Sequence, residues 1–387
     1  MWHGWLAQPW ETSQAFLHGW LAQPWETSRA FLHGWASQPC HIEKLVLYCW
    51  GTAAKRRTSM SHEINRRNFL KESLLASAGG AMALGAAARA SAAADQKPAA
   101  APAPAGQPQT LPLGKVGKLQ VSRILLGGNL LTHFTHSRDL KYVYNLCAHY
   151  NTDEKILETL ALAEQNGINT VSMHNPPGPM KILYKYRKQG GKIQWIICPT
   201  AEATGSLEAY TSQVRELVDN GCEAIYVWGV RSDQLIGAGK PELIGKCVEI
   251  ARDHGVLSGV GCHNLKVVEE CERLKIPADF YIKTFHHHKY PSGPKPEQIK
   301  GPYNENPGYW CADPEGTIAV MKKVEKPWMA FKVMAAGAIP PENAMTYAFG
   351  SGADHILLGM FDFEIAEDVG IANKVLAAVK RERPWRS

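Results

Sequence analysis

From about residue 111 onward, short apolar runs alternate with longer amphipathic stretches. Apolar runs of four to seven residues between turn residues predict buried strands, and apolar positions spaced three or four apart predict helices. Eight strands are expected, at 123–127, 169–174, 193–198, 224–228, 257–262, 279–285, 328–333 and 355–358. Eight helices are expected between and after them, at 153–166, 180–189, 206–220, 241–254, 265–274, 314–324, 341–350 and 365–380. Asp153 and Asp313 are placed to cap helix starts, and Gly167, Gly221 and Gly255 follow helix ends.

This alternation predicts an α/β fold, a (β/α)8 TIM barrel over residues 111–387. Eight strand–helix pairs fit the length of about 250 residues that is usual for such barrels. The alternative is a doubly wound parallel sheet, but no G-x-G-x-x-G turn follows the first strand.

The first 59 residues contain a repeat. His3–Leu17 is copied at His18–Leu32, with Arg29 in place of Gln14, and a third copy decays after His33. So few short units are poorly suited to burying a shared face. We interpret 1–59 as a spurious or disordered extension ahead of a start at Met60; the alternative is a genuine interaction module.

Residues 60–92 are typical of an export signal. Asn65–Lys71 reads NRRNFLK, like a twin-arginine motif, and a Gly/Ala-rich apolar segment and small residues near Ala90–Ala92 follow it. The apolar segment is too short for a permanent membrane span. A Pro/Ala-rich linker follows at 93–110. We therefore expect the twin-arginine machinery as a partner and a periplasmic or other extracytoplasmic location.

Net charge and cysteine spacing argue against two classes of protein, nucleic-acid-binding proteins and disulfide-stabilised scaffolds. The net charge is +6 over 387 residues but only +2 over 93–387, which gives no reason to expect a nucleic-acid partner. The seven cysteines from Cys147 onward form no C-x-x-C pair, so we expect buried thiols rather than a disulfide framework.

Several segments resemble the aldo/keto reductases. Residues 112–123 (PLGKVGKLQVSR) are similar to that family's N-terminal hairpin, 163–169 (AEQNGIN) to its approach to the second strand, and 261–264 (GCHN) to its Gly-Val-Ser-Asn position. The resemblance covers roughly residues 111–380 and implies a hairpin before the barrel, NADP as cofactor, and an Asp/Tyr/Lys/His tetrad that protonates a carbonyl.

The tetrad does not carry over. Its Asp falls on Ser172, its Lys near Cys198, and its His on Trp228 or Gly229. No Tyr follows the second strand directly, since Tyr184 and Tyr186 come later, within a predicted helix. Asn264 retains the cofactor-binding Asn, but its Ser neighbour is replaced by His263.

Histidines instead mark three strand ends, at His174, His263 and the pair His286 and His287. Strand C-termini share one face of a parallel barrel, and imidazoles suit Zn²⁺ and similar divalent metals. We expect these four as candidate metal ligands. Side chains alternate along a strand, so His286 and His287 do not both face inward, and His286 is favoured. The alternative is that each is a hydrogen-bonded turn residue.

Two lysines lie within predicted strands, Lys283 and Lys332. A buried lysine suits substrate binding, or catalysis as a base or Schiff-base amine; the alternative is a salt bridge or a helix-facing position. Asp362, just past the eighth strand, is a candidate base or a carboxylate that orients a histidine, and equally a plain loop residue.

Long loops at 128–152 and 288–312 follow strands one and six and are rich in Tyr, Trp, His and Asn. Loops of this length are typical of lids and binding loops, and the composition favours a carbohydrate-like small molecule. Three hypotheses remain open: metal-assisted lyase, isomerase or hydrolase chemistry; NADP-dependent reduction; and non-catalytic small-molecule binding.

Overall fold

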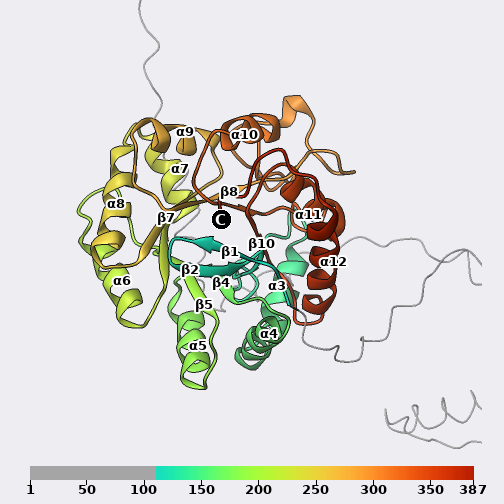
Figure 1. Ribbon diagram of the computed structural model, residues 1–387, viewed down its shortest axis with the longest axis horizontal. Helices are drawn as coiled ribbons and strands as arrows, with labels where there is room; N and C mark the ends of the chain where they lie inside the picture. Colours follow the sequence, from blue (N-terminus) through green and yellow to red (C-terminus); the bar gives the residue numbers. More distant parts are fainter. Residues whose placement is uncertain (1–109) are drawn as a thin grey trace, which may run out of the picture. The chain divides into compact units, whose positions relative to one another are not determined.

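The computed structural model describes residues 110–387, which form a closed eight-stranded parallel barrel surrounded by helices (Figure 1). The strand order around the barrel is β10-β3-β4-β5-β6-β7-β8-β9, so each strand pairs with its neighbour in sequence and the last pairs with the first. The predicted TIM barrel is confirmed, and the doubly wound alternative is excluded.

The predicted strands are found within two residues of their expected limits. The barrel strands are β3 (Ile124–Gly127), β4 (Thr170–His174), β5 (Gln194–Cys198), β6 (Ala224–Val227), β7 (Leu257–Cys262), β8 (Phe280–Thr284), β9 (Trp328–Phe331) and β10 (His355–Leu358). The helices are α3 (Lys141–Tyr150), α4 (Asp153–Gln165), α5 (Pro177–Lys188), α6 (Glu208–Asp219), α7 (Gly229–Gly237), α8 (Glu242–Asp253), α9 (Leu265–Arg273), α10 (Pro314–Met321), α11 (Pro341–Gly350) and α12 (Ile365–Ala378), with a 3-10 turn, η1 (Pro296–Gln298).

Two helices, α3 and α7, were not predicted. Neither has a side chain that caps its N-terminus, and α3 buries only Cys147 fully, so the usual start signal and apolar stripe are absent. The predicted cap at Asp313 is confirmed, since its side chain accepts from Gly316 N. The cap of α4 was placed one residue late: Thr152 accepts from Lys155 N, and Asp153 is the first helical residue.

Alternation along the strands separates an inner from an outer core. On β6, Ala224 and Tyr226 face the barrel interior, and on β8 Phe280 and Ile282 do the same. The neighbouring positions, such as Tyr281, pack toward the helices. An antiparallel hairpin, β1 (Leu113–Val116) and β2 (Leu119–Ser122), adds apolar side chains to the inner cluster and lies across the barrel in Figure 1. The hairpin expected from residues 112–123 is therefore present.

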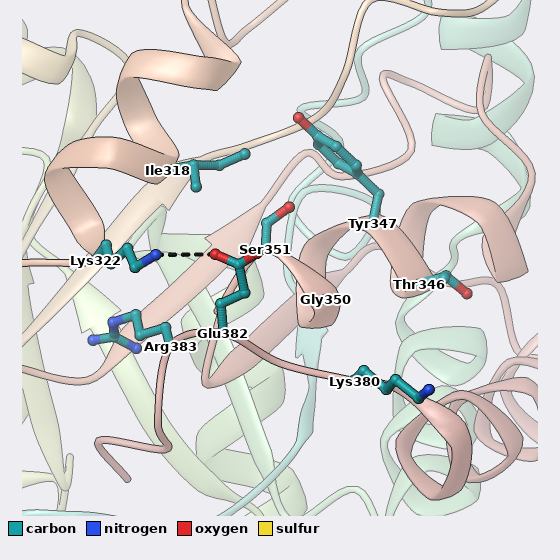
Figure 2. Close-up of a pocket in the computed structure, with 9 residues that line it drawn as sticks. All are labelled: Ile318, Lys322, Thr346, Tyr347, Gly350, Ser351, Lys380, Glu382 and Arg383. Carbon is teal, nitrogen blue, oxygen red and sulfur yellow. Dashed lines mark hydrogen bonds and ion pairs between the residues drawn. The ribbon is translucent and has the colours of Figure 1, made fainter.

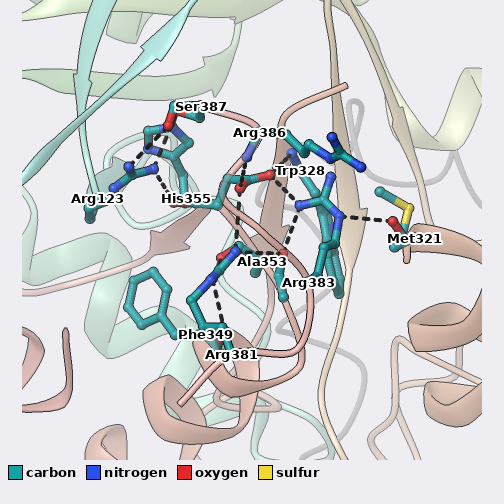
Figure 3. A network of polar contacts seen from close by, with 12 residues as sticks. Arg123, Met321, Trp328, Phe349, Ala353, His355, Arg381, Arg383, Arg386 and Ser387 are labelled. Atoms are coloured by element: carbon teal, nitrogen blue, oxygen red, sulfur yellow. Dashed lines mark hydrogen bonds and ion pairs between the residues drawn. The ribbon is translucent and has the colours of Figure 1, made fainter. Parts of the chain in front are cut away.

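A buried carboxylate anchors the C-terminal segment at the start of β10. Asp354 is fully buried, and its Oδ2 accepts from Arg383 Nη1 at 2.6 Å and from Trp328 N at 2.9 Å. Its Oδ1 accepts from Arg386 N at 2.9 Å and lies 3.5 Å from Arg381 Nη2. Figure 3 shows the arginines gathered around this strand start, with the last residues of the chain beside Arg123. The Asp354 carboxylate thus connects the start of β10 to the neighbouring strand β9 and to the chain end.

The predicted segments 1–59 and 60–92 lie outside the described residues, as does the linker up to residue 109. Within the described part, no helix combines the length and apolar character needed to cross a membrane. The seven cysteines there are all buried and unpaired.

Replacing Asp354 by Asn is expected to lower the free energy of unfolding by about 3–5 kcal/mol, because two buried guanidinium groups would lose their counter-charge. Urea unfolding followed by circular dichroism measures this. The control is Glu382→Gln, which breaks only the exposed pair with Lys322 and should change stability by less than about 0.5 kcal/mol. Equal effects of the two changes would contradict the anchoring role of Asp354.

Candidate active site

A cavity of about 660 Å³ opens at the C-terminal ends of the barrel strands. Its floor and walls include residues at or just past the ends of seven strands, β3, β4, β5, β6, β7, β9 and β10. Its upper wall comes from the loops after β3, β8, β9 and β10. This is the face on which barrel enzymes assemble their catalytic groups, and the volume is in the range of small-molecule sites.

Lys332, the first residue past β9, lines this cavity, and as a whole residue it is half-buried. Its Nζ is 5.3 Å from the ring centre of Trp310 and 5.9 Å from that of Phe331. Burial lowers the pKa of Lys332 to about 7, although the negative charges of Glu305 and Asp233 act in the opposite direction. A substantial fraction of this lysine is therefore an uncharged amine near neutral pH.

The backbone places this amine through an unusual conformation. Lys332 has a φ of 57°, in the left-handed region that non-glycine residues rarely adopt. Ala335 and Ala336 share that region at 47° and 55°. Strain of this kind persists where the surrounding structure imposes it, often at functional sites. Here it turns the chain sharply after β9, and the turn forms one wall of the cavity.

A first imidazole–carboxylate pair flanks Lys332. His136, from the loop after β3, and Glu305, from the loop after β8, are joined by a 2.5 Å contact between Nδ1 and Oε1. Burial and the positive charge of Lys332 lower the pKa of His136. Burial opposes ionisation of Glu305, but the hydrogen bond from His136, nearby positive charge including Lys332, and a hydrogen bond from Trp310 together outweigh it, so the pKa of Glu305 is lowered. The pair is thus a neutral imidazole donating to a carboxylate.

A second pair, His263 and Asp233, lies on the β7 side. His263 Nδ1 is 2.7 Å from Asp233 Oδ2, and Asp233 also accepts from the backbone N–H groups of His263 and Asn264. Burial and Lys332 lower the pKa of His263 to about 4. With Nδ1–H donated to Asp233, His263 Nε2 is an acceptor, and within residues 110–387 it has no hydrogen-bond partner. The ring of Tyr303 lies 4.5 Å from that of His263.

The third histidine of the cavity, His174 at the end of β4, belongs to an aromatic wall. It stacks on Trp228 with ring centres 6.0 Å apart and planes 11° apart, and Phe134 meets its edge at 5.6 Å. Burial lowers the pKa of His174 to about 4, so it is neutral at physiological pH.

The structure does not bring the four predicted metal ligands together. His286 Nδ1 bonds to the carbonyl of His287 at 2.9 Å, and its Nε2 accepts from Trp310 N at 2.9 Å. His287 Nε2 bonds to Asn343 Oδ1 at 2.7 Å, and its Nδ1 accepts from Lys289 N. Both rings therefore have no free nitrogen, because they brace the loop after β8.

Among the described residues, no group of three or more His, Cys, Asp and Glu side chains is arranged to hold a metal ion. Of the four histidines, only His174 and His263 line the cavity, and His263 is already bonded to Asp233. The side chains present do not fit a resident divalent metal, and we derive no step through one.

Three other predicted site residues lie outside the cavity lining. Lys283 shares the helix-facing side of β8 with Tyr281, and its Nζ bonds to Thr284 O at 2.8 Å. Asn264 caps α9 by accepting from Lys266 N. Asp362 accepts from Tyr150 and pairs with Lys155 at 3.0 Å on the outer rim. All three therefore have hydrogen-bond or ion-pair partners outside the cavity lining.

The positions that correspond to the reductase tetrad do lie in the cavity. Ser172, Cys198 and Trp228 all line it, and burial raises the pKa of the Cys198 thiol to about 12. Tyr184 and Tyr186 lie on α5 and do not line it. The three positions therefore face the cavity as the resemblance implies. They hold Ser, Cys and Trp, however, in place of the Asp, Lys and His of the tetrad.

Sequence reasoning missed Glu305 and Asp233. Asp233 lies in the unpredicted helix α7, five positions past Trp228, and Glu305 lies in an irregular loop far from any strand end. For Glu305, the one signal in the sequence is the His, Tyr and Trp content of the long loop at 288–312 that contains it. No such signal marks Asp233.

A second hollow, of about 460 Å³, lies between α10, α11 and the chain end (Figure 2). Its Lys322–Glu382 pair is exposed, and Arg383 is already engaged by Asp354. It contains no acid–base pair comparable to those at the barrel mouth.

Comparisons with known proteins leave the family of this chain open. Neither a scan of protein-family models nor a search of curated proteins found a match. A solved structure described as "Native KDPGal structure" is similar at 15% identity, covering 58% of this chain and 90% of that one, with a TM-score of 0.37. A similarity this low carries no information about activity.

Replacing Lys332 by Met is expected to raise the free energy of unfolding below about pH 7, where the buried amine must be charged in both states. The pKa of Lys332 is about 7 in the folded chain and near 10.4 in the unfolded chain. Between these two pH values the unfolded chain binds one proton more than the folded chain, so the free energy of unfolding of the wild type increases as the pH rises. The advantage of the variant should therefore shrink from pH 6 to pH 10.

Urea unfolding at pH 6, 8 and 10 measures this difference. Lys322→Met, which removes an exposed lysine, is the control and should show no such pH dependence. If the free energies of unfolding of the wild type and Lys332→Met differ by the same amount at all three pH values, the Lys332 amine is not desolvated.

Proposed function

We propose that this chain is an enzyme that acts on a small carbonyl compound, with the Lys332 amine as nucleophile. The observation that carries this proposal is an amine with a pKa of about 7, enclosed in a cavity between two imidazole–carboxylate pairs. An uncharged amine attacks a carbonyl, whereas an ammonium does not, so desolvation is a recognised means of activating a lysine nucleophile.

The chemistry proceeds with the chain's own groups. The amine adds to the carbonyl carbon, and the former carbonyl oxygen takes up one proton from solvent to give a carbinolamine. Loss of its hydroxyl as water then leaves a protonated Schiff base. His263 Nε2 is the free acceptor that takes the proton released by the amine and returns it to the departing hydroxyl. Asp233 stabilises the imidazolium formed in between, as carboxylates do for catalytic histidines.

A Schiff base withdraws electrons from the neighbouring carbon, which favours cleavage of an adjacent C–C bond or loss of a C–H proton. The reaction class is therefore a lyase or an isomerase. His136, held by Glu305, is positioned to exchange a proton on the other side of Lys332. The hydrogen-bonding groups around Lys332 suit a hydroxylated, sugar-like carbonyl head.

Incubation with glycolaldehyde and sodium cyanoborohydride is expected to add a stable two-carbon adduct at Lys332. Intact mass and peptide mapping detect it, and its yield should rise as pH passes through about 7. Lys283 in the same protein serves as an internal control, because it is buried away from the cavity. Labelling of Lys332 no faster than exposed lysines, or unchanged adduct formation in Lys332→Arg, would contradict the proposal.

A second candidate function is NADP-dependent carbonyl reduction. The cavity region contains Asp233, His263, Tyr303 and Lys332, the four residue types of the reductase tetrad supplied by other elements. Binding of NADPH would quench the fluorescence of Trp228 or Trp310 at the cavity, and carbonyl-dependent loss of absorbance at 340 nm would favour this function over Schiff-base chemistry.

A further inference from the structure

The cavity changes in polarity around the barrel. In the sheet order β7, β8, β9, the strand ends and loops supply His263, Tyr303, Glu305 and Lys332. The next strands in the closed order are β10 and β3. Lys332 lies at the boundary between the two sides, because it follows β9, which is shared by both.

The β10–β3 side of the cavity is mostly apolar, although the loop after β3 also supplies Asn129, Thr135 and the His136 described above. Its lining comes from the loop after β3, from α3, from the turn after β9 and from the segment after β10, and includes Leu130, Val143, Cys147, Met334, Ile339 and Phe361. Among the residues that the structure describes, Glu364 is the one acidic side chain lining this side. Burial raises the pKa of Glu364, and its Oε2 accepts a hydrogen bond from Phe361 N.

Exposed apolar side chains continue this side onto the rim. On α3, Val143 and Cys147 line the cavity, whereas Tyr142 and Leu146 are 68% and 61% exposed. Phe363 is 67% exposed and stacks on Phe361 with ring centres 5.3 Å apart. An apolar surface that runs from a cavity wall to its rim is the kind of surface that marks a ligand groove.

We infer that the substrate is amphipathic: its carbonyl head meets Lys332 and the imidazole–carboxylate pairs, and an alkyl or aryl group of about six carbons or more lies along the β10–β3 side. This inference rests on the proposed carbonyl chemistry of Lys332. A small polar carbonyl compound would leave the apolar wall in contact with water, and burying apolar surface on both partners favours the longer ligand.

The test compares propanal and hexanal as probes, both trapped on Lys332 with cyanoborohydride. The aldehyde concentration giving half-maximal trapping is expected to be at least tenfold lower for hexanal, since each buried methylene contributes about fourfold. Phe361→Ala should reduce this ratio several-fold. Leu274→Ala is the control, because Leu274 is an exposed apolar residue at the end of α9 that does not line the cavity, and it should leave the ratio unchanged.

Failure of the inference is distinguishable from failure of the proposed function. Equal trapping of propanal and hexanal by the wild type would overturn the amphipathic substrate and leave the Lys332 chemistry standing. The comparison uses the wild-type chain, so it holds even if Phe361→Ala does not fold. If neither aldehyde is trapped, calorimetry with 1-propanol and 1-hexanol decides: tighter hexanol binding supports the apolar side without Schiff-base chemistry, and equal or absent binding overturns both.

Discussion

The chemistry proposed for this chain depends on the removal of water from one amine. A lysine in solution is an ammonium at neutral pH, and only desolvation strong enough to outweigh neighbouring carboxylates makes it an uncharged base. Lys332 meets this condition because aromatic rings lie above and beside it, while the nearest carboxylates are engaged by histidines. If Glu305 or Asp233 bonded to the amine directly, the ammonium form would be stabilised instead. The imidazoles therefore keep the carboxylates occupied, in addition to the proton exchange proposed for them.

This arrangement is divided between two parts of the fold. The barrel supplies Lys332 and His263 at strand ends, whose positions follow from the sheet register. The loop after β8 supplies Glu305, Tyr303 and Trp310, and its own hydrogen bonds hold it in place. At the opposite end of the strands, Asp354 holds the chain terminus through groups that do not line the cavity. Stability is thus concentrated at one end of the barrel and chemistry at the other.

The sequence predicted the barrel well because each strand is a short apolar run and each helix has a regular stripe. It predicted the site less well, because which face a side chain occupies depends on a shift of one residue. Lys283 and Lys332 look alike in the sequence, each inside an apolar run near a strand end. Lys283 falls on the outer side of β8, whereas the left-handed turn at Lys332 directs that residue into the cavity. The partners Asp233 and Glu305 become neighbours of the lysine only through folding.

The run from His286 to His288 has a consequence for how the protein tolerates metals. The rings of His286 and His288 are hydrogen-bonded to the backbone at Trp310 and Cys311, next to the ring that shields the amine. An ion that captured His286 would have to displace the Trp310 N–H or the His287 carbonyl, and so disturb the loop. Burial also holds the pKa of His286 at about 3, so acid does not release the ring until far below neutrality. A histidine-rich stretch that looks like a chelator thus holds the loop after β8 in place through contacts that moderate acidity does not break.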